Sequence, residues 1–256
     1  MIYLPPGYDA PANAARRYPV MYLYSGSPGS QKDWFWHGRA ATIADELIAS
    51  GTVQPLIMVS PDGNGGAKRD TQFLDSANGK EPVERFLTRD VLSYVDGHYR
   101  TVRSARARGI AGYSAGAFGA LNVGLHHPEL FSALVGIDGY YVADPHEVTT
   151  TRINHPMSAN PAFIRFNSPT VTITTIPPSS RPSIFLFVST VDGLYMKDTM
   201  AFDHELSGLH VWHLTRLYAA NTKAERRLWP HSWFFAATVF RDNLPAIAAR
   251  LQGGSA

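Results

Sequence analysis

Short, nearly continuous apolar runs alternate along the chain with longer stretches in which apolar residues recur every three or four positions. The runs are too short for helices, and strands covered on both faces have this composition. They occupy residues 20–24, 56–59, 133–137 and 184–188, and further strands are expected over 109–111 and 211–217. The alternation predicts the α/β class, with a mostly parallel central sheet and crossover helices on both faces.

The longer stretches predict the helices that connect these strands. Apolar residues follow helical spacing over 40–48 and 87–95, and a further helix is expected over 117–126. Gly51 follows the first stretch, where the end of a helix favours a positive φ. The apolar stripe over 233–251 predicts a C-terminal helix that packs on the sheet.

Residues 140–183 interrupt the alternation with about 44 residues rich in Thr, Pro and Asn, which is far longer than a usual connection. We interpret this segment as an insertion before the strand at 184–188. Two interpretations stay open, a lid over a site and a surface loop. Nothing else divides the chain, so we expect one α/β domain over residues 1–256.

Composition narrows the classes of function. Hydrophobic residues make up 45% and charged residues 17% of the chain, which is typical of a globular protein with a large core. The net charge of +2 is small and the basic residues are scattered, so no nucleic-acid partner is predicted. The chain has no cysteine, which excludes disulfides, thiolate metal sites and a cysteine nucleophile. No apolar run is long enough to predict a membrane span.

The strongest chemical signal is the sequence Gly112-Tyr113-Ser114-Ala115-Gly116, between a predicted strand and a predicted helix. This is the nucleophile elbow of α/β hydrolases, in which a sharp turn exposes the serine hydroxyl. Strand and helix approach closely there, so the residues two before and two after the serine must be small. Ser114 is therefore the predicted nucleophile, and the backbone N–H of Ala115 is a predicted oxyanion-hole donor at the start of the helix.

The fold requires an acid after a later strand and a histidine after the last one. Asp192 follows the strand at 184–188 and is the predicted acid, with Asp138 and Asp198 as competing candidates. His231 follows the last predicted strand and precedes the C-terminal helix, so it is the predicted general base. Such a base accepts the serine proton, and the acid orients the imidazole. This mechanism needs no metal or cofactor.

Further site residues follow from their places along the chain. The loop after the strand at 20–24 should supply a second oxyanion donor, and the backbone of Ser27 is the best candidate because Pro28 has no N–H. Aromatic and polar residues near the expected mouth could contact an acyl, aryl or sugar group. The predicted substrate contacts are Trp34, Asp70, Tyr140 and Trp233.

With these residues in place, the chain resembles the putative-esterase family of α/β hydrolases, which includes esterase D, feruloyl esterases and the mycolyltransferases of the antigen 85 complex. The resemblance is carried by 3–8 (YLPPGY), 18–20 (YPV), 61–63 (PDG), 112–116 (GYSAG), 127–131 (HPELF) and 231–233 (HSW). It implies an α/β-hydrolase fold and a serine carboxylic ester hydrolase acting on a small-molecule, glycan or lipid ester.

Two departures from the family qualify this resemblance. Ser25-Gly26 stands where family members often have His-Gly, and the segment that begins at Tyr3 is preceded by further strands in the family. We therefore expect that N-terminal strands are missing from this sequence, and we expect an extracytoplasmic location, secreted or membrane-anchored, slightly more than a cytoplasmic one. Two alternatives stay open: an acyltransferase of the mycolyltransferase type that uses an alcohol acceptor, and a non-catalytic binding module on the same fold.

Overall fold

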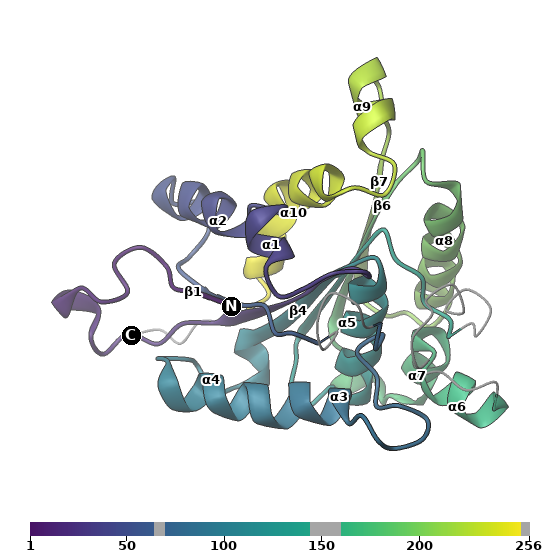
Figure 1. The fold of residues 1–256 in the computed structure, drawn as a ribbon, viewed down its shortest axis with the longest axis horizontal. Helices are drawn as coiled ribbons and strands as arrows, with labels where there is room; N and C mark the ends of the chain where they lie inside the picture. Colours follow the sequence, from purple (N-terminus) through teal and green to yellow (C-terminus); the bar gives the residue numbers. More distant parts are fainter. Residues whose placement is uncertain (64–69, 144–159, 252–256) are drawn as a thin grey trace.

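A seven-stranded sheet forms the centre of the computed structural model, which describes residues 1–63, 70–143 and 160–251 (Figure 1). The strand order is β1-β3-β2-β4-β5-β6-β7, and only β1 runs antiparallel to its neighbour. The strands are β1 (Ile2–Tyr3), β2 (Val20–Tyr24), β3 (Ile57–Val59), β4 (Arg108–Tyr113), β5 (Ala133–Ile137), β6 (Ser183–Ser189) and β7 (His213–Tyr218). The predicted α/β class is confirmed.

Two layers of helices cover the two faces of the sheet. One layer contains α1 (Asp33–Trp36), α2 (Ala40–Ala49) and α10 (Trp233–Ala248). The other contains α3 (Val83–Arg85), a π-helical turn (Phe86–Val91), α4 (Leu92–His98), α5 (Ala115–His126), α7 (Pro169–Thr175) and α8 (Gly193–Gly208). Two further short helices are α6 (Pro161–Phe166) and α9 (Lys223–Leu228), and α9 projects from the body of the molecule (Figure 1).

Strand β2 explains why the strands are apolar at every position. Its side chains alternate between the faces, so that Met21 and Leu23 join the core under α2 and α10, whereas Val20, Tyr22 and Tyr24 join the core under α4 and α5. All five side chains are buried. A strand covered on both sides has no solvent-facing position, and the period-two pattern is lost.

The predicted insertion at 140–183 is only partly described by the structure. Its described end forms α6 and α7, and Ile173 of α7 is buried in the core beside α5. Pro161 and Pro169 each occupy the first turn of a helix, where a missing N–H costs nothing. Residues 144–159, on which most of the lid interpretation rests, lie outside the described residues.

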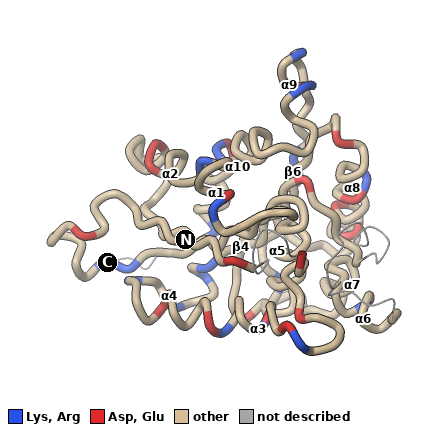
Figure 2. Tube along the Cα trace, viewed as in Figure 1, with Lys and Arg blue, Asp and Glu red and all other residues tan. Residues whose placement is uncertain are grey.

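Basic and acidic residues are interspersed over the helices on both faces of the sheet (Figure 2). Among the helices that the structure describes, none has the length and apolar composition needed to cross a bilayer.

Candidate active site

The turn from β4 into α5 holds Ser114 in a conformation that non-glycine residues rarely adopt, with φ of 59° and ψ of −124°. The Ser114 N–H donates to the carbonyl of Ile137 at 3.0 Å, which ties the turn to the end of β5. A side chain on Gly112 would overlap the carbonyl of Gly116, and one on Gly116 would overlap the carbonyl of Tyr24. The two glycines therefore allow the close approach of strand and helix that the elbow requires.

His231 lies in the connection between α9 and α10, and its Nε2 is 2.8 Å from the Ser114 Oγ. Ser232 follows it and caps α10, accepting a hydrogen bond from the Phe235 N–H at 3.2 Å. The imidazole ring lies between two tyrosine rings, with centroid distances of 4.9 Å to Tyr113 and 4.3 Å to Tyr195. The start of α10 and the two tyrosines thus position the histidine against the serine.

Two carboxyl groups face the other nitrogen of the imidazole. Asp192, between β6 and α8, has its Oδ2 3.5 Å from His231 Nδ1. Asp138, directly after β5, has its Oδ2 3.9 Å from the same nitrogen and is fully buried. Strands β5 and β6 are neighbours, so the residues that follow them meet at one edge of the sheet. Of the three acids considered from sequence, Asp198 instead lies within α8.

The surroundings shift the pKa of both His231 and Asp138. Burial lowers the pKa of His231, and the negative charge of Asp192 partly offsets this shift. Burial raises the pKa of Asp138 to about 8. The hydrogen bond from the Ser189 N–H lowers this pKa, and the negative charge of Asp192 raises it further. At neutral pH the Asp138 carboxyl therefore holds a proton, and the imidazole is neutral.

The loop after β2 passes directly beside the serine. A Cβ added to Gly26 would lie 3.2 Å from the Ser114 Cβ. The next turn is tied by the Ser30 N–H, which donates to Asp33 Oδ2 at 2.8 Å. Ala115 is the first residue of α5, so its N–H has no carbonyl within the helix to bind. This arrangement brings Ser27 and Ala115 to the neighbourhood of the serine, and their role as oxyanion donors stays a prediction.

The prediction that Trp34 contacts substrate is wrong. Its side chain is completely buried, and its Nε1–H donates to the Tyr24 carbonyl at 2.8 Å. Its ring packs against Trp233 and Phe240 in the core between α1 and α10. Trp233 is partly buried and lies 4.9 Å from the Tyr113 ring, which places it behind the tyrosine that supports His231.

Asp70 and Tyr140 are joined through Gln72, a residue that the sequence analysis did not single out. The Gln72 amide donates to Asp70 Oδ1, and the Tyr140 hydroxyl donates to Gln72 Oε1. The Tyr140 ring stacks on Phe118 of α5 at 5.0 Å and faces Tyr195 at 6.5 Å. Tyr140 thus lies beside Tyr195, which stacks on His231, whereas Asp70 is buried. No pattern in the sequence pointed to Tyr195.

Among the described residues, Asp138, Asp192 and His231 form the one group whose ligand atoms lie close enough together for a metal ion, all within 4.8 Å of one another. The two carboxyl groups lie beside Nδ1 of His231, and Nε2 of the same ring is 2.8 Å from the Ser114 hydroxyl. A carboxyl that holds its proton is also a poor ligand. The donor set therefore fits an acid-base relay better than a metal site.

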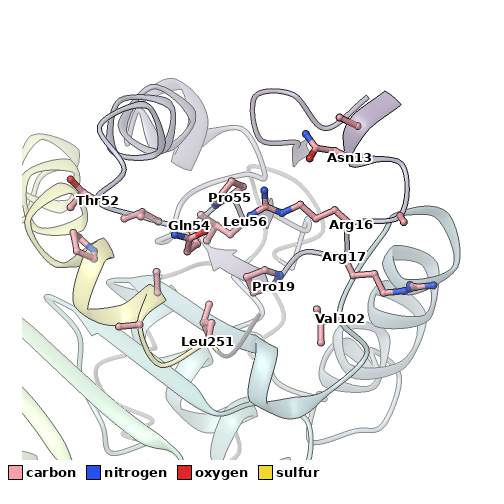
Figure 3. A pocket seen from close by; sticks show the side chains of 16 residues that line it. Asn13, Arg16, Arg17, Pro19, Thr52, Gln54, Pro55, Leu56, Val102 and Leu251 are labelled. Atoms are coloured by element: carbon pink, nitrogen blue, oxygen red, sulfur yellow. The ribbon is translucent and has the colours of Figure 1, made fainter. Parts of the chain in front are cut away.

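A hollow of about 1000 Å³ lies far from these residues, at the other end of the sheet. Figure 3 shows its lining, with Pro19 before β2, Leu56 before β3 and Leu251 after α10. The Arg16 side chain points into it, whereas Arg17 points away. Ser114 follows the carboxyl end of β4, so the hollow and the candidate active site occupy opposite edges.

Comparisons with known proteins identify a family and several relatives of this chain. The model of the family described as Putative esterase matches residues 1–157. An endo-1,4-beta-xylanase/feruloyl esterase of Xylanibacter ruminicola is 32% identical over 134 residues, which are 51% of this chain and 18% of that protein. An esterase of Mycobacterium tuberculosis is 33% identical over 120 residues, which are 47% of this chain and 24% of that protein.

Solved structures show the same fold. A ferulic acid esterase superposes with a TM-score of 0.80 at 20% identity, covering 97% of this chain and 91% of that one. The chain spans 18% of the first of these curated relatives and 24% of the second, which is less than a third of the length of each.

Proposed function

The chain belongs to the Putative esterase family, and from this premise we propose that it is a serine hydrolase of carboxylic esters that works through an acyl-enzyme on Ser114. One observation carries the proposal: the His231 Nε2 lies 2.8 Å from the hydroxyl of a serine held in a nucleophile elbow. A serine hydroxyl is a weak nucleophile at neutral pH until a neighbouring base accepts its proton.

The proposed reaction begins when Ser114 Oγ attacks the ester carbonyl while its proton passes to His231 Nε2. The negative charge that develops on the carbonyl oxygen is stabilised by backbone N–H groups, for which Ser27 and Ala115 are the candidates. The tetrahedral intermediate then collapses, and the alcohol leaves with the proton from Nε2. Water attacks the acyl-enzyme by the same route, with His231 first accepting and then returning a proton.

Asp192 is the proposed partner of the imidazolium in both halves of the reaction. Its Oδ2 lies 3.5 Å from Nδ1 in the free protein, and catalytic hydrogen bonds often shorten only when substrate binds. Its charge raises the pKa of His231 against the effect of burial, so it favours proton transfer from the serine. The carboxylate orients the ring and does not itself take the proton.

The walls of the site favour an ester with an aromatic or other flat apolar group. Tyr195 and Tyr140 face each other beside the histidine, and aromatic rings bind such groups by stacking. The relative from Xylanibacter ruminicola is named a feruloyl esterase, which is consistent with this substrate class. We also propose that the protein is located outside the cytoplasm, secreted or membrane-anchored.

The test is hydrolysis of a p-nitrophenyl ester series, from acetate to palmitate, and of methyl ferulate. Wild type is compared with Ser114→Ala and with Ser104→Ala, a serine that caps the turn before β4, remote from the elbow. Turnover that disappears in Ser114→Ala and persists in Ser104→Ala supports the proposal. Wild type that hydrolyses none of these esters, and whose Ser114 is not labelled by a fluorophosphonate, would favour a binding module instead.

A further inference from the structure

Asp138 occupies a position that the mechanism above does not explain. It is completely buried at the end of β5, and its φ of 45° lies in the left-handed region. Its Oδ1 accepts a hydrogen bond from the Ser189 N–H at 3.0 Å, and its own N–H donates to the Phe187 carbonyl. In the part of the chain that the structure describes, its Oδ2 has no hydrogen-bond partner, and it lies 3.9 Å from His231 Nδ1. A buried oxygen without a partner is costly, so a purely structural role does not account for it.

The His231 imidazole is positioned so that its Nδ1–H could bind either of two carboxyl groups. Tyr113 and Tyr195 stack on its two faces at interplanar angles of 29° and 17°, and so fix the plane of the ring. They do not fix its rotation within that plane. Nδ1 is buried and has no hydrogen-bond partner among the described residues, at 3.5 Å from Asp192 and 3.9 Å from Asp138. A small rotation in the plane would bring Nδ1 nearer to one carboxyl or the other.

We propose that Asp138 is a second orienting residue for His231, so that the acid of this site is the Asp138–Asp192 pair rather than Asp192 alone. Either carboxyl accepts the Nδ1–H hydrogen bond when Nε2 takes the serine proton. The pair holds one proton and one negative charge while the imidazole is neutral. This inference rests on the proposed function, since it concerns the same proton transfer.

The charges around Asp138 are consistent with one shared proton. Burial raises the pKa of Asp138 to about 8, and the charge of the neighbouring Asp192 adds to this shift. The other titratable groups that face Asp138 are His231, Tyr113 and Tyr141, and burial raises the pKa of both tyrosines above the usual range. Both tyrosines remain neutral, so among these groups only Asp192 and His231 can carry a charge near Asp138. Two carboxyl groups that share one site do not both ionise readily, because their negative charges repel each other.

The test compares the kcat of Asp192→Asn, Asp138→Asn and the double variant on the best p-nitrophenyl ester. A lone orienting carboxylate is worth about 10⁴-fold in kcat. We expect Asp192→Asn to lose only about 10²-fold because Asp138 replaces it, Asp138→Asn to lose less than about tenfold, and the double variant to lose about 10⁴-fold. Asparagine tolerates a positive φ and keeps the oxygen that accepts from Ser189. Asp198→Asn, on α8, controls for loss of a nearby carboxylate and should stay within about twofold of wild type.

A pH profile separates positioning from a structural role and does not require a variant at Asp138. In Asp192→Asn the remaining carboxyl orients the histidine best when it is ionised, so kcat should rise between about pH 6 and about pH 9. Burial, the larger cause of the raised pKa of Asp138, is unchanged in this variant, so the midpoint should stay within this range, at or below that of Asp138 in wild type. Circular dichroism checks that each variant is folded.

Two results would overturn the inference. One is an Asp192→Asn variant that is already as slow as the folded double variant. The other, which decides the matter if the double variant does not fold, is a kcat of Asp192→Asn that is flat over this pH range. Failure of the proposed function looks different, because wild type itself would then neither turn over esters nor react with a fluorophosphonate.

Discussion

At the scale of single residues, the elbow depends on glycine at positions where a side chain would not fit. Gly112 lies in β4 against the carbonyl of Gly116 in α5, so its Cβ position is already occupied by backbone. We expect Gly112→Ala to lower the free energy of unfolding by about 3 kcal/mol, because backbone cannot move aside as a flexible side chain can. Urea denaturation measures this.

Gly97→Ala is the matched control for the elbow variant. Gly97 lies in α4, and a Cβ added there meets no atom within 4 Å. Alanine is the better helix former, so this variant should be more stable than wild type by about 0.5 to 1 kcal/mol. Equal destabilisation by both variants would contradict the argument from close approach.

The pKa of His231 gives a second prediction at this scale. Burial lowers that pKa below its ordinary value of 6.5, so the ring stays neutral and able to accept a proton in more acidic solution. The acidic limb of the kcat/KM profile of wild type should therefore have its midpoint below pH 6.5. Tyr195 covers one face of the ring, and Tyr195→Ala should expose the ring to water and move the midpoint upward.

Tyr94→Ala is the control for the exposed ring. Tyr94 stacks on His98 at 4.1 Å, in the same manner, on the outside of α4. Its removal should leave the kcat/KM profile unchanged. An acidic limb with a midpoint above pH 6.5 in wild type would show that burial does not dominate the protonation of His231.

At the scale of elements, the carboxylate of Glu84 joins three helices around α5. It lies in α3 and is contacted at 2.9 Å by His126 Nδ1 and by His127 Nε2 at the end of α5, while His126 Nε2 donates to the Phe166 carbonyl of α6 at 2.8 Å. Burial alone would raise the pKa of Glu84, but the two histidine hydrogen bonds bring it below the ordinary value. The carboxylate is therefore ionised and paired.

We expect Glu84→Ala to lower the free energy of unfolding by about 3 kcal/mol, because it leaves two histidines without their buried acceptor. Glu129 is the other carboxylate near His127, and the side chain of Glu129 is 65% exposed. Glu129→Ala should therefore lower the free energy of unfolding by less than about 0.5 kcal/mol. Thermal or urea unfolding of the two variants checks this. Similar losses in both would mean that the buried cluster does not hold the helices together.

The elements themselves were largely predictable from the sequence. The four apolar runs correspond to β2, β3, β5 and β6, because a strand buried on both faces needs apolar residues at every position. The strands expected over 109–111 and 211–217 correspond to β4 and β7. β1 was missed, since two residues carry no period. α7 was missed because its Thr, Val and Ile residues are weak helix formers, although Pro169 in its first turn was a usable signal.

The candidate site was predictable where it depends on chain order and not where it depends on packing. The order of Ser114, Asp192 and His231 follows from the fold, and the structure brings these three residues together. The stacking of Tyr195 on the histidine depends on how α8 is oriented, which no local pattern encodes. Trp34 was misjudged because position after a strand does not say whether a side chain faces the mouth or the core.

At the scale of the whole molecule, the sheet has two edges with different properties. The carboxyl ends of the parallel strands carry Ser114, Asp138 and Asp192, whereas the hollow in Figure 3 lies at their amino ends. In open α/β sheets ligands bind outside the carboxyl ends of the strands. The size of a hollow is therefore a poorer guide to the site than its place on the sheet.

This view predicts that substitutions at the two edges have different effects on catalysis. Tyr140→Phe removes the hydroxyl that binds Gln72 beside the histidine, and should lower kcat/KM by about tenfold through a looser wall. Arg16→Ala changes the hollow at the opposite edge and should alter neither kcat nor KM. Steady-state kinetics on the same ester measures both. If Arg16→Ala, correctly folded, weakened substrate binding instead, the hollow would have to be part of the working site and the assignment of function to the carboxyl edge would be incomplete.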